Sequence, residues 1–366
     1  MNADIVIVGA GVIGCAVADA LSAVGAGRIV VVDRGRPGAE ASSAAAGLLA
    51  VASSRAPGGA LFALRRASVA LFPALVDDLR ERTGIDAGYC GSGALDIAFS
   101  DAEADALAGL VSRRVAQGLR AELLSPRAAS GLEPALNAMA RAAAFFPEDR
   151  CVDPVRLVEA LHAAAAARGV EFRFGAAVTG IDAAGTRVRA VVANGESIAL
   201  GRLVIAAGAW SREIGKLLRV KIPVIPDKGE MVAVTGGPTI RHTLSWNDGY
   251  LVPRNGEIVI GATSVRGCDD KTVSAVSLAL LLGRAAQMVP ELAAATLARS
   301  WAGLRPCSTI RRPIIGPLPG YENALLATGH HRAGIMLAPI TAKLITELIV
   351  NGATSMPIEP FCYRRH

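Results

Sequence analysis

Apolar and polar residues alternate along the chain with a period that changes several times, from short apolar runs to helical spacing and to period two. Residues 5–8 form a short β-branched run, and residues 28–33 form a second run that ends at Asp33. Such runs are typical of strands buried on both faces of a parallel sheet. The alanine-rich stretch between them has helical spacing. The order strand, helix, strand therefore predicts a βαβ unit at the N-terminus.

Helical spacing returns at residues 60–83, 101–120 and 155–170. Strand-like stretches, "AFFPEDRCVDP" and "EFRFGAAVTGI", flank the last of these. Residues 215–300 then alternate apolar and polar positions with period two, as in "EMVAV" and "EIVIGAT", which predicts a segment that is largely β-sheet. A final strand, "NALLATGHHRAGI", is followed by a helix, "APITAKLITELI", which we expect to begin near Pro339. The chain is thus an α/β protein with a second sheet.

Three glycines follow the first strand and open the first helix. They stand at Gly9, Gly11 and Gly14, in the spacing G-x-G-x-x-G. Gly9 permits a tight turn, Gly11 lets the backbone approach a pyrophosphate, and Gly14 lets helix and strand pack closely. Asp33, 19 residues after Gly14, is placed to bind a ribose diol and to repel a 2′-phosphate. The pattern predicts a dinucleotide that contains ADP and lacks a 2′-phosphate.

The glycine spacing and Asp33 are compatible with either FAD or NAD as the dinucleotide. The next segment helps to distinguish the two cofactors. Residues 35–50 carry almost no side-chain bulk. The candidate contacts there are Ser42, Ser43, Ala46, Gly47 and Leu48. One reading is a flexible loop of small residues. The other is a loop that lies close against an extended ligand, with serine hydroxyls on phosphate.

The stretch "ASSAAAGLLA", with "AAGAW", "DGYLVPRNGEIVIGAT" and "SWAGLRP" further on, resembles amino-acid-oxidising flavoproteins of the D-amino-acid oxidase superfamily, specifically the glycine oxidase branch. The resemblance covers nearly the whole chain. It implies FAD as the cofactor and a Rossmann-type FAD-binding domain with an interleaved α+β substrate domain built on an antiparallel sheet. The FAD-binding domain would comprise residues 1–83, 145–214 and 300–366. The substrate domain would comprise residues 84–144 and 215–299.

The resemblance also implies contacts with FAD beyond the glycine turn and the small-residue segment. These are Arg34, Val178, Ala207, Gly208, Trp210, Gly329, His330, Arg332, Gly334, Ile335 and Met336. Small residues around Ala207 and Gly208 allow a close approach to the ligand. Gly329 and Gly334 do the same under the pyrimidine end of the flavin, where a helix N-terminus favours negative charge. An ordinary core valine would look the same as Val178 in sequence.

Three residues are the candidates for catalysis, again from the resemblance. Tyr250 would lie over the flavin face, Arg305 would pair with the substrate carboxylate, and Arg332 would lie further out and set the electric field. An exposed surface arginine is the alternative for Arg332. His330 and His331 suit packing or hydrogen bonds better than acid–base catalysis.

The implied reaction is oxidation of the Cα–N bond of a small primary or secondary amino acid. Hydride transfer to FAD gives an imine that hydrolyses to an oxo acid, with oxygen as the acceptor. One alternative is the FAD subunit of a heteromeric opine or D-hydroxyproline dehydrogenase that passes electrons to partner subunits. A flavin-dependent RNA-modifying protein and a non-catalytic flavin scaffold are further alternatives. We expect a homo-oligomer or such a heteromeric subunit, with a small amino-acid or amine carboxylate as substrate.

The sequence departs from the glycine oxidase pattern at three places. After "RP" the family's acidic turn is replaced by a segment that contains Cys307, Arg311 and Arg312. Ser264-Val265-Arg266 follows "GAT", and "HHRA" replaces a pattern with an aromatic residue and an asparagine. We expect these changes to cluster at the site entrance and to favour a bulkier or doubly carboxylated amine over glycine. A covalent link between Cys307 and the flavin is left open.

Composition and charge narrow the class of protein. The chain has 366 residues, is 52% apolar, and carries a net charge of +6. Its arginines are spread along the whole length among acidic neighbours, which argues against a nucleic-acid surface. The six cysteines are scattered without metal-ligand spacing, so we expect reduced thiols and no metal. No signal peptide and no apolar run of about 18 residues is evident. A cytoplasmic protein without an integral membrane segment is predicted.

Overall fold

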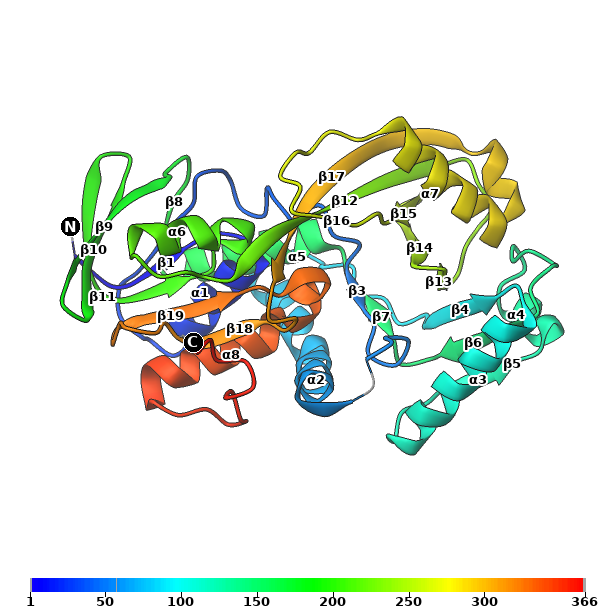
Figure 1. The fold of residues 1–366 in the computed structure, drawn as a ribbon, viewed down its shortest axis with the longest axis horizontal. Coiled ribbons are helices and arrows are strands. Elements are labelled where there is room, and N and C mark those ends of the chain that lie inside the picture. Colours follow the sequence, from blue (N-terminus) through cyan, green and yellow to red (C-terminus); the bar gives the residue numbers. More distant parts are fainter. Residues whose placement is uncertain (1, 57, 365–366) are drawn as a thin grey trace.

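The computed structural model describes residues 2–56 and 58–364. Two large sheets lie side by side, and the long strands β12 (Val224–Thr235) and β17 (Thr296–Ser308) run from one toward the other (Figure 1). A two-stranded sheet of β3 (Leu48–Leu49) and β7 (Arg150–Cys151) lies between them. This matches the predicted α/β fold with a second, largely antiparallel sheet.

The first large sheet has eight strands and a parallel centre. Its order is β18 (Ile314–Pro317), β19 (Ala324–Thr328), β11 (Glu196–Ile205), β1 (Asn2–Val8), β2 (Ile29–Val32) and β8 (Glu171–Arg173), with β10 (Arg187–Ala193) and β9 (Val178–Ala184) extending from β11. The pairings of β1 with β2 and β11, of β2 with β8 and of β11 with β19 are parallel. The β18–β19 and β9–β10–β11 pairings are antiparallel.

Alternate side chains of β1 enter two separate cores, as expected for a strand buried on both faces. Ile5 and Ile7 pack in a cluster with the helices α1 (Val12–Ala23), α2 (Gly59–Thr83), α5 (Pro154–Ala167) and α8 (Gly334–Asn351). Val6 and Val8 pack on the other face with β10, β11 and α6 (Ser211–Leu217). The predicted βαβ unit is therefore present, in a sheet of Rossmann type.

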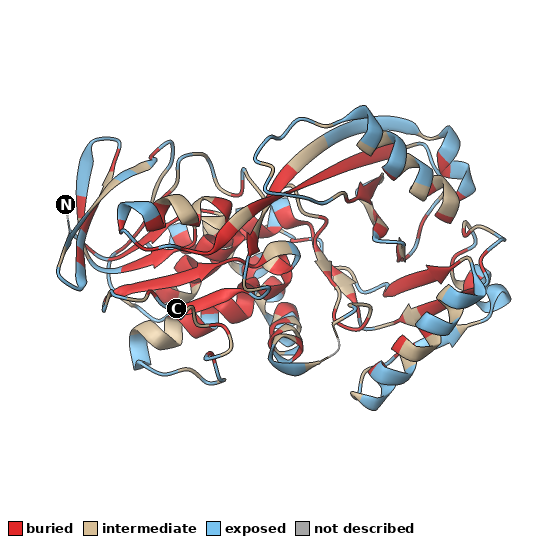
Figure 2. Ribbon diagram, viewed as in Figure 1, coloured by how far each residue is buried: buried red, intermediate tan, exposed pale blue. Residues whose placement is uncertain are grey.

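The second large sheet has nine strands. Its order is β16 (Val265–Arg266), β12, β15 (Glu257–Gly261), β14 (Gly249–Arg254), β13 (Thr243–Trp246), β4 (Ala94–Ala98), β6 (Ala142–Phe146) and β5 (Glu122–Leu124), and β17 pairs with β12. The pairings are antiparallel except for β13 with β4. The helices α3 (Asp101–Ala116), α4 (Pro126–Leu132) and α7 (Ala275–Met288) accompany it. Strands β2, β19, β4 and β12 are mostly buried, whereas the first five residues of β17 and the outward faces of α3 and α7 are exposed (Figure 2). The residue limits of the two domains stay a prediction.

Helix α7 interrupts the segment that we predicted to be largely strand. Its buried residues are Leu281, Ala285 and Met288, at helical spacing along one face. The run "SLALLLG" hides this spacing because nearly every position is apolar, so period two and period 3.6 fit it equally well. The prediction was wrong for these 14 residues.

Helix α8 begins at Gly334 rather than near Pro339, so that prediction was wrong as well. Pro339 lies inside the helix, where a proline ring crowds the carbonyl four residues earlier. The Ser68 hydroxyl of α2 donates to the Met336 carbonyl at 2.6 Å and accepts from the Ile340 amide at 3.4 Å. A buried serine thus takes up the backbone groups next to the proline, which allows the helix to continue through it.

Two cysteines contradict the expectation of scattered reduced thiols. Cys90 and Cys151 form a disulfide, with their Cα atoms 5.4 Å apart. They meet because an isolated antiparallel bridge joins their backbones across 61 positions of sequence. The spacing of the cysteines in the sequence does not predict this pairing. Cys15, Cys268, Cys307 and Cys362 are free.

Two helices are long and apolar enough to cross a membrane by length and composition, residues 59–83 and 331–351. No apolar run of that length was expected from the sequence. A buried core helix passes the same test, and the second of these packs against α1 and α2. The first buries one face, with Phe62, Phe72 and Leu79 inward, and exposes Asp77 and Arg80.

Candidate active site

One large cavity, of about 770 Å³, extends from the glycine turn after β1 to the strands of the second sheet. Its walls come from the β1–α1 turn, residues 40–56, the start of β9, residues 206–214, strands β12, β14 and β17, and the turn before α8. Segments far apart in the sequence therefore line one continuous space. Its volume lies in the range of natural cofactor and ligand sites.

The glycine turn at the first end of the cavity has no room for side chains. Gly9 has φ +110°, and a Cβ there would lie 2.5 Å from the Ala206 carbonyl oxygen. A Cβ at Gly14 would overlap the Gly9 carbonyl. Gly11 is more open, with only the Ser42 hydroxyl at 3.2 Å from an added Cβ. Gly9 and Gly11 line the cavity, and Gly14 holds α1 against the turn from behind.

The N-terminus of α1 points into the same region. The Ser42 hydroxyl accepts a hydrogen bond from the Val12 amide at 2.9 Å. Unpaired amides at the start of a helix, with its positive dipole end, form a binding place for phosphate. Ser42 therefore lies where a pyrophosphate and a helix N-terminus would meet. Ser43 turns away, and its hydroxyl donates to the Glu40 carbonyl at 3.2 Å.

Asp33 at the end of β2 lines the cavity beside the glycine turn. Its carboxylate accepts from the Ala10 amide at 2.6 Å and from the Gly35 amide at 2.7 Å, so its orientation is fixed. The Arg34 guanidinium lies 3.7 Å from the centre of the Trp210 ring. Arg34, Val178, Ala207, Gly208 and Trp210 also line the cavity. A flat, charged wall of this kind suits an adenine and its ribose.

The small-residue segment forms the middle wall. Gly47 has φ +78°, and a Cβ there would overlap the Val152 carbonyl. The Ala46 carbonyl accepts from the Arg254 guanidinium of β14, which also reaches the Val152 carbonyl at 3.2 Å. Ala46, Gly47 and Leu48 line the cavity. Arg254 thereby ties the middle wall to the second sheet.

Two buried charged side chains fix the loop of residues 50–56 that continues this wall. Asp149 accepts from the Val51 and Ala52 amides at 3.0 and 2.9 Å and from the Ser53 amide and hydroxyl. Burial raises the pKa of Asp149, although these hydrogen bonds act in the opposite direction. Arg114, buried on α3, donates to the Ala52 carbonyl at 2.8 Å and to two further carbonyls of the loop. Neither residue was predicted from the sequence.

Tyr250 and Arg305 lie at the other end of the cavity, on β14 and β17. A Cβ at Gly229 would overlap the Arg305 guanidinium, and a Cβ at Gly261 would lie 2.5 Å from the Tyr250 hydroxyl oxygen. Both side chains therefore lie flat over glycines of neighbouring strands. Burial raises the pKa of the Tyr250 phenol, so it is un-ionised at neutral pH.

Arg305 has two further contacts that set its position. Its Nη1 donates to the Thr263 carbonyl at 2.9 Å and lies 3.8 Å from Oδ2 of the buried Asp227. Burial lowers the pKa of Arg305, yet a guanidinium stays charged throughout the physiological range. A mostly buried cation whose carboxylate neighbour Asp227 lies as far away as 3.8 Å retains donors for a bound anion.

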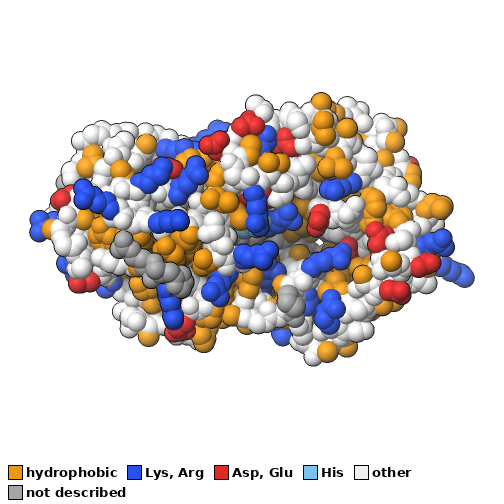
Figure 3. Space-filling model, in the orientation of Figure 1, with side chains coloured by type: hydrophobic (Ala, Val, Ile, Leu, Met, Phe, Trp, Pro, Cys, Tyr) orange, Lys and Arg blue, Asp and Glu red, His pale blue; other side chains and the backbone are white. Residues whose placement is uncertain are grey.

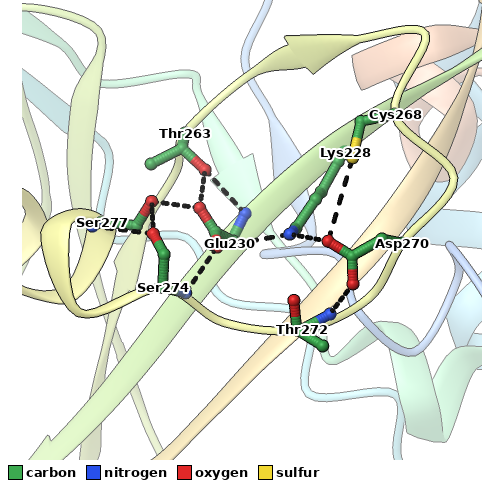
Figure 4. Close-up of polar contacts among 8 residues, drawn as sticks. All are labelled: Lys228, Glu230, Thr263, Cys268, Asp270, Thr272, Ser274 and Ser277. Carbon is green, nitrogen blue, oxygen red and sulfur yellow. Dashed lines mark hydrogen bonds and ion pairs between the residues drawn. The ribbon is translucent and has the colours of Figure 1, made fainter.

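Behind Arg305, a polar network holds Thr263 in place (Figure 4). Lys228 and Glu230 project to the opposite face of β12 from Gly229 and Met231, which line the cavity. Glu230 accepts from the Thr263 hydroxyl at 3.1 Å, and the Glu230 amide donates to that hydroxyl at 2.9 Å. Lys228 pairs with Asp270 at 2.7 Å. The network anchors the segment after β15 whose Thr263 carbonyl orients Arg305.

The turn before α8 closes the cavity. His330 is buried, its Nε2 lies 3.0 Å from the Thr341 hydroxyl, and burial lowers its pKa to about 3. His330 is therefore neutral and has a structural hydrogen bond. Arg332 is exposed, and it lines the cavity together with Gly334, Ile335 and Met336. Gly329, at φ +73°, packs against Ser308 behind the wall.

A scan against known families matches residues 4–348 to the DAO family, described as FAD dependent oxidoreductases. The chain belongs to this family. The glycine oxidase of Geobacillus kaustophilus is 37% identical over 99% of this chain and 97% of its own length. Its crystal structure matches the whole of this chain and 99% of that one, with a TM-score of 0.95 at 35% identity. These findings confirm the predicted family, fold class and enzyme class, a glycine oxidase-like FAD-dependent oxidoreductase.

Two other relatives carry different names. The hydrogen cyanide synthase subunit HcnC of Pseudomonas aeruginosa is 33% identical over 99% of this chain and 96% of its own length. The structure of iminodiacetate oxidase from Chelativorans sp. BNC1 matches 98% of both chains, with a TM-score of 0.90 at 25% identity.

The predicted FAD cofactor is confirmed by the family, and the residues present fit it. The turn at Gly9 and Gly11, the N-terminus of α1 and Asp33 can hold the pyrophosphate and ribose. The small side chains of residues 44–47 leave the middle of the cavity open. The N-terminus of α8 would meet the pyrimidine end of the flavin.

Most of the predicted site residues line this one cavity, and three do not. Gly14, Ser43 and Gly329 lie behind its wall. The departures from the family pattern divide between two places. His331 and Ala333 of "HHRA" line the cavity, whereas Arg311 and Arg312 are exposed and, like Ser264, Val265 and Arg266, are not among the cavity-lining residues. We expected all three changes to cluster at the site entrance, and of the three only the one at "HHRA" lies in the cavity wall. Cys307 is buried behind Pro306, and its thiol lies 3.9 Å from the Ser308 carbonyl.

Several cavity-lining residues were not predicted. They include Arg55, Arg65, Asp96, Gly229, Met231 and His331. The glycine in the strand "DKGEMVAV" was a usable signal for Gly229, because a glycine inside a strand marks a close approach. The pairing of β12 with β17 that makes it important is not visible in the sequence.

Proposed function

We propose that the chain oxidises the Cα–N bond of a small primary or secondary amino acid. The names of its relatives support this, since glycine oxidase resembles it over nearly the full length of both chains. The observation that carries the proposal is Arg305, a mostly buried guanidinium that lines the cavity and lies flat over Gly229. A rigid guanidinium fork in a largely apolar site suits an amino-acid carboxylate.

In this proposal the chain's own residues bind and orient the substrate. Arg305 pairs with the carboxylate, and Tyr250 covers the substrate from the second sheet. Arg332 adds positive charge from the turn before α8. Bound FAD supplies the acceptor for the hydride of Cα, and the imine product hydrolyses in water to an oxo acid. Positioning and electrostatics account for most of the catalysis.

A heteromeric dehydrogenase is the second candidate, in which the chain passes electrons to partner subunits. Its similarity to HcnC, which is named as a subunit, favours it. We propose oxygen as the acceptor and a homo-oligomer as the assembly, with the heteromer as the alternative. A cytoplasmic location without a membrane-spanning segment and the domain limits given above are part of the same proposal. A flavin-dependent RNA-modifying protein is less well supported, because Lys and Arg are spread over the face shown in Figure 3 and not gathered in one patch.

The substrate can be narrowed by one experiment. The FAD-loaded protein is mixed anaerobically with glycine, sarcosine, D-alanine, D-proline, iminodiacetate and an opine, and the rate of flavin bleaching is measured. Bleaching by at least one amine, lost in Arg305→Met, supports the proposal. Bleaching by none of them contradicts it. Admission of oxygen then separates the two candidates, since an oxidase releases peroxide at the rate of turnover and a dehydrogenase subunit needs an artificial dye.

A further inference from the structure

His331 and Asp227 form a hydrogen-bonded pair at the substrate end of the cavity. His331 Nε2 lies 2.6 Å from Asp227 Oδ2, although the two residues are 104 positions apart. The Asp227 side chain is fully buried, and the His331 side chain is 29% exposed and lines the cavity. A buried carboxylate thus supports an imidazole that a ligand can reach.

Asp227 is held firmly by its other contacts. The Ser264 hydroxyl lies 2.8 and 2.9 Å from its two carboxylate oxygens, and Arg305 Nη1 lies 3.8 Å from Oδ2. These contacts follow from the sheet, because Asp227 on β12 is paired with Arg305 on β17. Burial alone would raise the pKa of Asp227, but the hydrogen bonds from His331 and Ser264 and the charge of Arg305 lower it overall. Asp227 is therefore ionised at neutral pH.

The position of His331 is fixed by the backbone as well. His331 has φ +51°, a left-handed conformation that histidine adopts more readily than most residues. It directly follows His330, whose backbone bridges to Cys307 of β17. Because Asp227 occupies Nε2, Nδ1 is the ring nitrogen left for a ligand, and no residue in the described part of the chain hydrogen-bonds it.

The charged groups that face His331 are Asp227, Arg305 and Arg332. Burial lowers the pKa of His331, Asp227 raises it, and the two arginines lower it further, so the net shift is downward. At neutral pH the imidazole is therefore uncharged and can accept a proton. The same two cations disfavour an ammonium group beside them.

We propose that His331 is the base that takes a proton from the ammonium group of the substrate, with Asp227 as its positioning residue. The inference rests on the proposed function and adds a step to it. An α-amino group is largely protonated near neutral pH, and an ammonium nitrogen has no lone pair to assist departure of a hydride from Cα. In the proposed step one N–H bond of the ammonium breaks and an Nδ1–H bond forms. The positive charge moves from substrate to imidazole, and no electrons are exchanged.

Asp227 has two effects in this step. Its hydrogen bond fixes the proton of neutral His331 on Nε2, so the lone pair is on Nδ1. Its negative charge then stabilises the imidazolium. The arrangement is the general one in which a buried carboxylate orients a histidine base.

The test compares His331→Gln and Asp227→Asn with the unaltered protein, all loaded with FAD. His162→Gln is the matched control, because His162 packs against Phe172 and Phe174 and does not line the cavity. The rate of anaerobic flavin bleaching by the best amine is measured from pH 6 to pH 10. The affinity for acetate, a carboxylate without an amine, is measured through the flavin spectrum.

At pH 7 we expect His331→Gln to bleach about a hundredfold more slowly, in the range typical of general base catalysis. The bleaching rate of His331→Gln should keep rising about tenfold per pH unit, because free amine becomes available. Over the same pH range the rate of the unaltered protein should already have levelled off. Acetate affinity should change by less than about threefold. Asp227→Asn should show an intermediate loss, and His162→Gln none.

A second measurement does not depend on turnover. The chain has five histidines, so nitrogen-15 labelling of histidine gives few signals, and His331→Gln assigns one of them. In the FAD-free protein we expect His331 to be protonated on Nε2 at neutral pH, and Asp227→Asn to abolish that preference. An Nδ1-protonated or charged ring would contradict the proposal.

Three outcomes of the kinetic test would overturn the inference. A normal rate and pH profile in His331→Gln would show that no base is needed there. A parallel loss of acetate affinity would make His331 part of the anion site. Failure of every amine to bleach the unaltered protein would overturn the proposed function and this step together, whereas bleaching that His331→Gln leaves intact would overturn the step alone.

Discussion

The guanidinium of Arg305 lies against the backbone of Gly229, so closely that a Cβ atom there would overlap its Cζ atom and both Nη atoms. The two residues belong to the paired strands β17 and β12, on which Gly303 is the direct neighbour of Gly229. The position of the cation in the cavity therefore depends on a missing side chain in the next strand. Most contacts at this end of the cavity likewise join strands that are far apart in the sequence.

Gly229→Ala should displace Arg305 without removing it. A single methyl group must push the guanidinium away from the place where it meets a carboxylate, and each charge-assisted hydrogen bond lost is worth roughly 1.5–3 kcal/mol. We expect kcat/KM to fall about 30-fold or more with FAD content unchanged. Gly283→Ala on α7 is the control, since an added Cβ there meets nothing within 4 Å. Equal kcat/KM in both variants would mean that Arg305 does not hold the substrate.

Arg305→Met should lower kcat/KM by about a hundredfold or more and keep FAD bound. The carboxylate would lose its partner in a site with little water, and misplacement of Cα adds to the loss. Each factor of ten corresponds to about 1.4 kcal/mol. Arg305→Lys should recover only part, because an ammonium restores charge but not the planar fork. A Met variant that loses its flavin would instead show a structural role.

Gly14→Ala should impair FAD binding. Its Cβ would overlap the Gly9 carbonyl, and relief requires α1 to move away from the turn that meets the pyrophosphate. We expect the purified variant to hold less than about a tenth of the FAD of the unaltered protein, a difference of more than 1.4 kcal/mol. The flavin-to-protein absorbance ratio measures it. Gly131→Ala on α4, where a Cβ meets nothing within 4 Å, should stay fully yellow.

The nucleotide end of the cavity could be predicted because its signal is local. One βαβ unit contains all four of its key residues, Gly9, Gly11, Gly14 and Asp33. Their spacing in the sequence therefore predicts their relative positions in the structure. The substrate end is different. Gly229, Asp227 and His331 meet Arg305 only through the register of β12 with β17 and the turn before α8, which no local pattern specifies.

The departures from the family pattern were interpreted by their position in the sequence, and for Arg311 and Arg312 this proved misleading. Arg311 and Arg312 stand a few residues after Arg305, yet they are exposed on a turn that leaves the cavity. His331, in contrast, was set aside as a packing residue and lines the cavity. Nearness along a strand does not translate into nearness at a site, because successive residues point to opposite faces and the strand soon ends.

The disulfide should contribute measurably to stability. It joins residues 61 positions apart in the sequence, and the chain-entropy estimate for a loop of that length is roughly 4 kcal/mol. The double variant Cys90→Ala with Cys151→Ala should therefore lose about that free energy of unfolding in urea. Reducing agent should destabilise the unaltered protein by a similar amount and leave the double variant unchanged. Equal stability with and without reductant would show that the two thiols are not joined in solution.

Asp96 should make the free energy of unfolding decrease as the pH rises, the reverse of the effect of most carboxylates. The residue is 5% exposed in the wall of the cavity, and its pKa is raised to about 6 by burial, opposed by Arg55 and assisted by Glu103 and Asp248. The folded protein therefore binds more protons at this site than the unfolded chain, whose carboxyl has a pKa near 3.8. Its contribution to stability falls as pH rises from about 4 to 6 and stays low above that.

Asp96→Asn removes this dependence because an amide does not ionise in the window. A difference of about two pKa units corresponds to roughly 3 kcal/mol, so the stability of the variant relative to the unaltered protein should rise by about that amount between pH 4 and pH 8. Urea unfolding at the two pH values measures it. The exposed Asp105→Asn is the control and should give the same difference from the unaltered protein at both pH values. If Asp96→Asn also gave a constant difference, Asp96 would titrate alike in the folded and unfolded chain, and its burial beside Arg55 would have no net effect on its charge.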